Sequence, residues 1–90
     1  MTYALRMTSP LRPRLVEAVE HALAGERERA HVIVQDHDGD RIADWIHAVV
    51  HRMEGDLGNA RYWYGRCGRR LREEVPVQRE LEEIRAELGA

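Results

Sequence analysis

The residues best suited to chemistry lie between His47 and Arg66. His47, His51 and Glu54 follow one another at spacings of four and three residues, so in a helix their side chains stack on one flank. Two histidines at this spacing can chelate one metal ion, and Glu54 can supply a third ligand. Without a metal, the same groups suit acid–base chemistry, because imidazole titrates near neutral pH. The sequence therefore points to a divalent metal site or a proton-transfer site on one helix face.

The neighbouring residues narrow this chemistry. In the common helical zinc-protease motif a glutamate directly follows the first histidine, whereas here Ala48 follows His47, which excludes that class. No serine or cysteine lies near enough in sequence to suggest a nucleophile. The single cysteine, Cys67, excludes an internal disulfide and a cysteine-based zinc site, and we expect it to be a packed thiol on an apolar helix face. Whether the chain is an enzyme stays open.

Polar and aromatic residues on other segments extend the candidate site. We expect the histidine flank to converge with side chains of the neighbouring helices on a polar pocket. The candidate ligand-binding residues are His31, His47, His51, Glu54, Asn59, Tyr62, Trp63 and Arg66, and the candidate metal ligands are His47, His51 and Glu54. The favoured alternative is a structural hydrogen-bond network in which imidazoles, Asn59 and Tyr62 satisfy one another. For the aromatic residues, packing is favoured over a stacking platform for a ligand.

Helical periodicity predicts the elements that position these residues. Apolar residues recur at spacings of three and four over about five segments, and the expected helices cover 10–24, 26–36, 40–54, 57–67 and 76–88. Gly25 and Gly55 stand where helices end, Asp38 or Asp40 suits the cap of the third helix, and Asp56 suits the cap of the fourth. Ser9 and Pro10 are typical of a helix start. The fold class is therefore an all-α bundle.

Two segments leave alternatives open. Residues 31–35 (His-Val-Ile-Val-Gln) have a strand-like composition, but a lone strand has no partner elsewhere in the chain, so we predict helix for 26–36. In the last helix, Val77, Leu81, Ile84 and Leu88 form a narrow apolar seam. That seam packs either on the chain's own bundle or on a second copy of the same helix.

Length and charge exclude several classes of protein. Ninety residues make one domain, 1–90, with a hairpin core at 40–68 and a C-terminal helix at 76–88. The net charge of −2 gives no global basic field for nucleic acid or an anionic membrane. No apolar run approaches the ~20 residues of a membrane span, and we expect a cytoplasmic protein. A local basic patch follows the fourth helix, where we expect it to complement the helix C-terminus; it consists of Arg66, Arg69, Arg70 and Arg72.

The segment around Gly55 resembles the second half of a tetratricopeptide repeat. The matching positions are Gly55, Asp56, Leu57, Ala60, Tyr64 and Cys67. In the first half Ala48 fits, whereas Asp44, His47 and His51 stand where the repeat has apolar or aromatic residues. No second copy follows at a ~34-residue period. The resemblance implies a helical hairpin whose inter-helix positions hold partly buried histidines.

A longer string of residues resembles a group of short bacterial proteins without an assigned activity. They carry His-Arg-x-Glu-Gly-Asp followed by Asn-Ala-x-Tyr-Trp-Tyr/Phe-x-Arg, and the matches here are His51, Arg52, Glu54, Gly55, Asp56, Asn59, Ala60, Tyr62, Trp63, Tyr64 and Arg66. Upstream, Ala30-His31 and Gln35-Asp36 match two further pairs. This resemblance supports the helical fold and implies no reaction.

Two functions follow from the sequence as expectations. The first is a small helical interaction or scaffold module that self-associates as a homodimer, through the last helix or the aromatic face of the fourth, or binds another protein. The alternative is a small-ligand- or metal-binding protein, with enzymatic activity left open. Neither expectation includes a nucleic-acid or membrane partner, and the only cofactor considered is a divalent metal.

Overall fold

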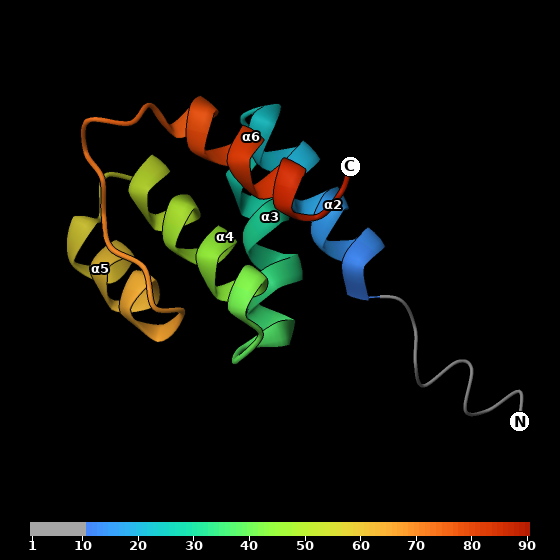
Figure 1. Ribbon diagram of the computed structural model, residues 1–90, viewed down its shortest axis with the longest axis horizontal. Coiled ribbons are helices and arrows are strands. Elements are labelled where there is room, and N and C mark those ends of the chain that lie inside the picture. Colours follow the sequence, from blue (N-terminus) through green and yellow to red (C-terminus); the bar gives the residue numbers. More distant parts are fainter. Residues whose placement is uncertain (1–10) are drawn as a thin grey trace, which may run out of the picture.

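Five α-helices account for most of the computed structural model, which describes residues 11–90 (Figure 1). They are α2 (Leu11–Leu23), α3 (Arg27–Val34), α4 (Arg41–Met53), α5 (Leu57–Arg66) and α6 (Val77–Glu87), with a 3₁₀ turn η1 (Gln35–His37) after α3. No strand occurs in this range, so the all-α prediction is confirmed, including helix rather than strand after Glu26. The expected start at Ser9 and Pro10 lies outside the described residues. No helix among the described residues has the length and apolarity needed to cross a membrane.

Helix α4 is the centre of the bundle. In Figure 1, α5 lies on one side of α4, and α2, α3 and α6 lie on the other. Every residue from Ala43 to Val50 is buried, which is typical of a helix surrounded by neighbours. The helix begins at Asp40, whose carboxylate accepts hydrogen bonds from the backbone N–H groups of Ile42 and Ala43 at 3.1 and 2.9 Å. Of the two predicted caps, Asp40 is therefore the one used.

The turn between α4 and α5 follows the predicted chemistry. Gly55 has a φ of +81°, in the region that favours glycine, and the Asp56 carboxylate accepts from the backbone N–H of Asn59. Tyr64 and Cys67 are buried on the inner face of this hairpin. The Cys67 thiol donates to the carbonyl of Tyr64 at 3.4 Å, and burial raises the pKa of that thiol. A packed thiol is thus what the structure contains.

Helix α6 packs on its own bundle. Leu81, Ile84 and Leu88 are buried, and the helix contacts α4 and α2. The seam is therefore occupied within the chain, and the homodimer stays a prediction that would need another surface, such as the aromatic face of α5. Pro76 has extended backbone and immediately precedes α6, so it is the cap residue and not the first helical residue as predicted.

A buried carboxylate, Glu80, joins α6 to the rest of the fold. Its side chain is 1 % exposed and accepts from the Tyr64 hydroxyl at 2.8 Å, from Trp45 Nε1 at 2.9 Å and from Arg52 Nη1 at 2.8 Å. Arg52 also donates to the carbonyl of Val75. Burial and the neighbouring carboxylate raise the pKa of Tyr64, which keeps its hydroxyl a donor. Since a buried charge is costly unless hydrogen-bonded, these donors are needed for the fold.

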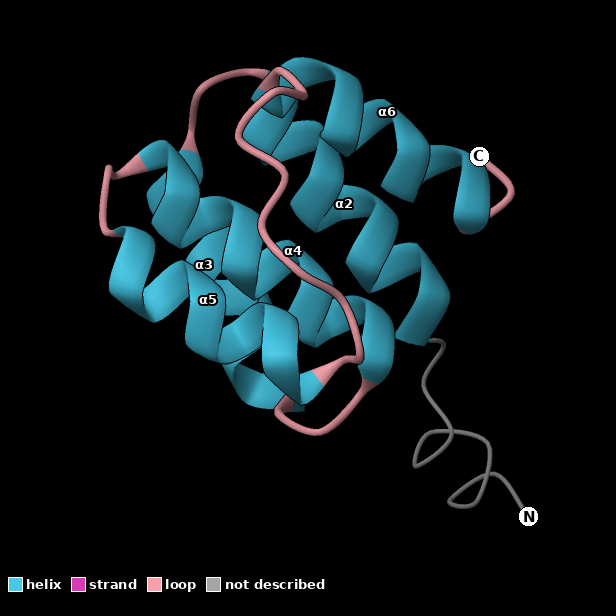
Figure 2. Cartoon of the chain, turned by 60° about the vertical axis from the view of Figure 1, so that its left-hand side comes forward, coloured by secondary structure: helices cyan, strands magenta, loops and turns pink. Residues whose placement is uncertain are grey.

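One of these donors, Arg52, also holds the long connection between α5 and α6. Residues 67–76 form no helix and run back across α4 (Figure 2). Arg52 reaches this connection through the Val75 and Glu73 carbonyls, while Arg72 pairs with Glu83 at 2.6 Å. The connection is therefore attached to the helices at several points along its length.

We expect Tyr64→Phe to lower the free energy of unfolding by about 1.5–3 kcal/mol, because it removes a hydrogen bond to a buried carboxylate. Tyr62→Phe is the matched control: the same hydroxyl is removed from the same helix, at a side chain that is 55 % exposed, and the expected change is below about 0.5 kcal/mol. Chemical denaturation of both variants measures the difference. Equal effects would mean that the Glu80 network contributes nothing specific.

Candidate functional site

Three histidines from two helices converge beside the hairpin. His31 comes from α3, and His47 and His51 come from α4, one turn apart. The Nε2 atoms of His31 and His47 lie 3.0 Å from each other. One ring nitrogen from each of the three histidines can be chosen so that all lie within 4.8 Å of one another. The structure thus gathers three of the predicted site residues into one group, which we term the histidine cluster.

The packing of α3 on α4 brings His31 to this place. Ala30, Ile33 and Val34 are buried and fix the face that α3 presents to its neighbours. His31 then lies at the edge of that face, partly exposed, and its ring meets the His47 ring edge-on with centroids 4.7 Å apart. The apolar residues of α3 therefore set the register that places this imidazole.

Trp63 closes the cluster from the side of α5. Its ring stacks on the His47 ring, with centroids 3.8 Å apart and planes inclined by 11°. The His51 ring lies 5.1 Å from the His47 ring at 17°. His47 is thereby enclosed and only 4 % exposed, which is deeper than the partial burial expected from the sequence.

Arg66 and Tyr62 lie outside the histidine group, at the rim formed by α5. The Arg66 guanidinium carbon is 5.2 Å from the Trp63 ring centroid, and Arg66 Nη1 donates to the Tyr62 hydroxyl at 3.0 Å. This hydrogen bond raises the pKa of Arg66. These two residues therefore flank the Trp63 ring. Among the described residues, neither of them forms a hydrogen bond with an imidazole nitrogen.

Glu54 has a different position from the one predicted for a third ligand. Its Oε1 lies 3.3 Å from His51 Nδ1, and its Oε2 lies 3.7 Å from Arg27 Nε. The structure therefore places His31, and not Glu54, in the three-ligand group that contains His47 and His51. Glu54 instead belongs to a second possible group with His51 and Asp56. As a partner of His51 Nδ1, it can orient that ring and fix its tautomer, which is a common arrangement behind metal-binding histidines.

Asn59 serves the start of α5. Its Nδ2 donates to the Asp56 carboxylate at 2.7 Å, and its backbone N–H donates to the same carboxylate. These hydrogen bonds lower the pKa of Asp56. The prediction that Asn59 joins the histidines in one hydrogen-bond network is therefore wrong. Among the described residues, its side chain forms a hydrogen bond with Asp56, the cap of α5, and with no histidine.

The protonation of His47 follows from its surroundings. Burial, together with positive charge on His31 or His51, lowers its pKa to about 4, against a small opposing effect of Asp38. His47 is consequently neutral at pH 7. Its Nδ1 is buried and has no hydrogen-bond partner among the described residues. Because the facing Nε2 atoms of His31 and His47 can share only one proton, one of the two rings donates through Nε2 and the other accepts through Nε2.

This geometry is close to that of a zinc site. In a tetrahedral site with Zn–N bonds of roughly 2.0–2.1 Å, two ligand nitrogens lie about 3.3 Å apart. The His31–His47 pair, at 3.0 Å, is close to this separation, and the partly buried His51 adds a third ring nitrogen to a group whose members lie within 4.8 Å of one another. Imidazole ligands suit zinc, copper, nickel and cobalt and not magnesium or calcium. The histidine cluster can therefore hold a transition metal and leave one coordination position open.

Hollows of organic-ligand size lie elsewhere on the described surface. Five of them, with volumes of about 230 to 340 Å³, are lined by residues outside the histidine cluster. An ion needs no such volume. The three ring nitrogens of the cluster, which lie within 4.8 Å of one another, suit a single ion.

We expect the free energy of unfolding to fall as the pH is lowered from 6.5 to 4. The unfolded chain protonates His47 near pH 6.5, whereas the fold delays this protonation to about pH 4, so between these values the unfolded state binds the extra proton. The free energy of unfolding is not reduced by His47 above pH 6.5, and the reduction caused by its protonation approaches about 3 kcal/mol at pH 4. Denaturation curves across this range, compared with those of His47→Gln, measure the effect. A pH slope unchanged in the variant would assign it to other groups.

Comparison with known proteins supplies no further guide to this site. No protein-family model, curated protein or solved structure matches the chain. The likenesses to a tetratricopeptide hairpin and to short bacterial proteins stay predictions from the sequence. The functional argument therefore depends on the geometry of the histidine cluster.

Proposed function

We propose that this protein binds a divalent transition-metal ion through His31, His47 and His51. The observation that carries the proposal is the convergence of three imidazoles from two helices, with two Nε2 atoms 3.0 Å apart. Zinc is the metal best matched by three neutral imidazoles and an open fourth position. Glu54 would act behind the site by holding the His51 ring through Nδ1.

A purely structural network would use the same contacts differently. In it, one shared proton joins the Nε2 atoms of His31 and His47. His47 Nδ1, which has no partner among the described residues, is unpaired in this network and also with a metal on Nε2. One wall of the cluster is the face of the Trp63 ring, which stacks on the His47 ring. The hydrogen bonds of His47 lie in the plane of the imidazole, so a ring stacked on its face supplies none. Metal coordination would use the Nε2 lone pairs of His31 and His47 together, since these two nitrogens lie 3.0 Å from each other.

The proposed ion would also link two elements of the fold. His31 lies on α3, while His47 and His51 lie on α4, so coordination joins these helices. A ligand that binds only the folded chain stabilises it by mass action, by about 2.7 kcal/mol at a hundredfold excess over Kd. With three protein ligands, the fourth position would be free for water or a second small ligand, which is the feature that would permit catalysis.

We expect untagged protein to take up one Zn²⁺ per chain, with a rise in Tm on zinc addition. Elemental analysis, native mass spectrometry and thermal melts measure the uptake and the stabilisation. His47→Ala should abolish both. His51→Gln, a change at a more exposed ring, should weaken binding at least tenfold and leave the fold intact, so loss of binding can be separated from unfolding.

His37→Ala is the matched control, because His37 lies on η1 outside the histidine cluster. It should keep the wild-type stoichiometry and the zinc-dependent rise in Tm. Uptake that falls equally in His37→Ala and His51→Gln, or the absence of stoichiometric zinc in the wild type, would contradict the proposal and favour a structural cluster.

A further inference from the structure

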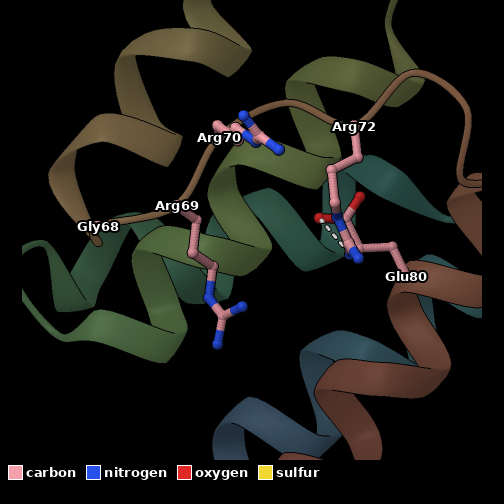
Figure 3. A pocket seen from close by; sticks show the side chains of 5 residues that line it. All are labelled: Gly68, Arg69, Arg70, Arg72 and Glu80. Carbon is pink, nitrogen blue, oxygen red and sulfur yellow. Dashed lines mark ion pairs between the residues drawn. The ribbon is translucent and has the colours of Figure 1, made fainter.

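The connection between α5 and α6 contributes three arginines to one hollow. The hollow has a volume of about 230 Å³ and is lined by Gly68, Arg69, Arg70, Arg72 and Glu80 (Figure 3). A second hollow of about 260 Å³ adjoins the same segment and shares two of these arginines. Three arginines of the basic patch noted in the sequence therefore surround open space. The patch does more than complement the C-terminus of α5, which was the role expected from the sequence.

Arg69 is held with its donors free. Its guanidinium carbon lies 3.3 Å from the centroid of the Trp45 ring, so the planar group is stacked on the indole. Stacking uses the face of a guanidinium and leaves its five N–H groups, which point outward in the plane. Trp45 is itself fixed by its hydrogen bond to Glu80. Trp45 and Arg69 also line a neighbouring hollow of about 250 Å³. The Glu80 network thus orients a cation that lines both hollows.

Positive charge in the lining is not balanced within the chain. Among the described residues, neither Arg69 nor Arg70 forms an ion pair within 4.0 Å. The only carboxylate in the lining, Glu80, is already matched by Arg52 at 2.8 Å and by Arg72 at 3.9 Å. The ion pair of Glu80 with Arg72 is drawn in Figure 3, where Arg69 and Arg70 lie apart from it. Two guanidinium groups are therefore available to a ligand.

We propose that this hollow binds a small phosphate-bearing ligand through Arg69 and Arg70. Guanidinium groups match the geometry of phosphate oxygens and form paired, charge-assisted hydrogen bonds with them. The volume of about 230 Å³ admits a phosphate group with a small attached body. An extended nucleic acid would need many phosphate contacts along a basic surface, whereas this patch is confined to one connection in a chain with a net charge of −2.

This site is independent of the proposed metal site. Trp45, which supports the hollow, projects from α4 about 160° away from His47 and about 120° away from His51 at 3.6 residues per turn. No residue of the hollow belongs to the histidine cluster. Failure of either proposal would therefore leave the other standing.

Titration with inorganic phosphate at low ionic strength tests the proposal. Side-chain Nε–Hε NMR signals of the arginines and calorimetry report binding. We expect saturable shifts confined to Arg69, Arg70 and Arg72. Arg70→Gln should weaken phosphate binding at least fivefold without changing Tm in the absence of phosphate, because Arg70 is exposed and unpaired among the described residues.

Arg29→Gln is the matched control: an exposed arginine is changed in the same way on α3, and phosphate binding should equal that of the wild type. Equal losses in both variants, or the same shifts with chloride at matched ionic strength, would mean general screening and would overturn the proposal. Binding of citrate in preference to phosphate would overturn the assignment of the ligand class.

Discussion

The interaction on which the rest of the structure depends is the burial of the Glu80 carboxylate among donors from α4 and α5. Tyr64, Trp45 and Arg52 each donate to it, so the position of α6 is fixed by hydrogen bonds as well as by apolar packing. Removing one partner from such a group leaves a buried charge short of donors. The same contacts set the Trp45 ring on which Arg69 stacks. The position of α6 and the orientation of Arg69 therefore both depend on this one charge.

Sequence reasoning identified the helices and the hairpin because their signals are local. Gly55 and Asp56 act at the turn as predicted, and helical periodicity found α4 with its buried face. Glu80 was missed because its segment, Val-Gln-Arg-Glu-Leu-Glu-Glu, resembles a solvated charged helix. One signal was present: Glu80 lies three residues after Val77 and four before Ile84, on the apolar seam itself. Its donors lie 16 to 35 residues away in sequence, beyond any local pattern.

The candidate site was predicted in part for the same reason. The spacing of His47 and His51 is a local signal, and the two side chains lie together on one face of α4 as expected. Whether His31 or Glu54 is the third member of the histidine cluster depends on two things. One is how α3 packs on α4, and the other is the rotamer that directs the Glu54 side chain to His51 Nδ1. The spacing of residues along one helix predicts neither. The departure from the repeat pattern was informative, since Asp44 and His47, which replace apolar or aromatic residues, are both buried.

The burial of α4 on all sides has a consequence for hydrogen exchange. Amides exchange through local opening, and the elements with the most buried contacts open last. Separate opening of α6 would expose Glu80 and remove it from the lining of the arginine hollow, and separate opening of α3 would release His31, while α4 stayed folded in both cases. The chain can thus lose either polar cluster by a partial opening that leaves its central helix protected, and the two clusters need not open together.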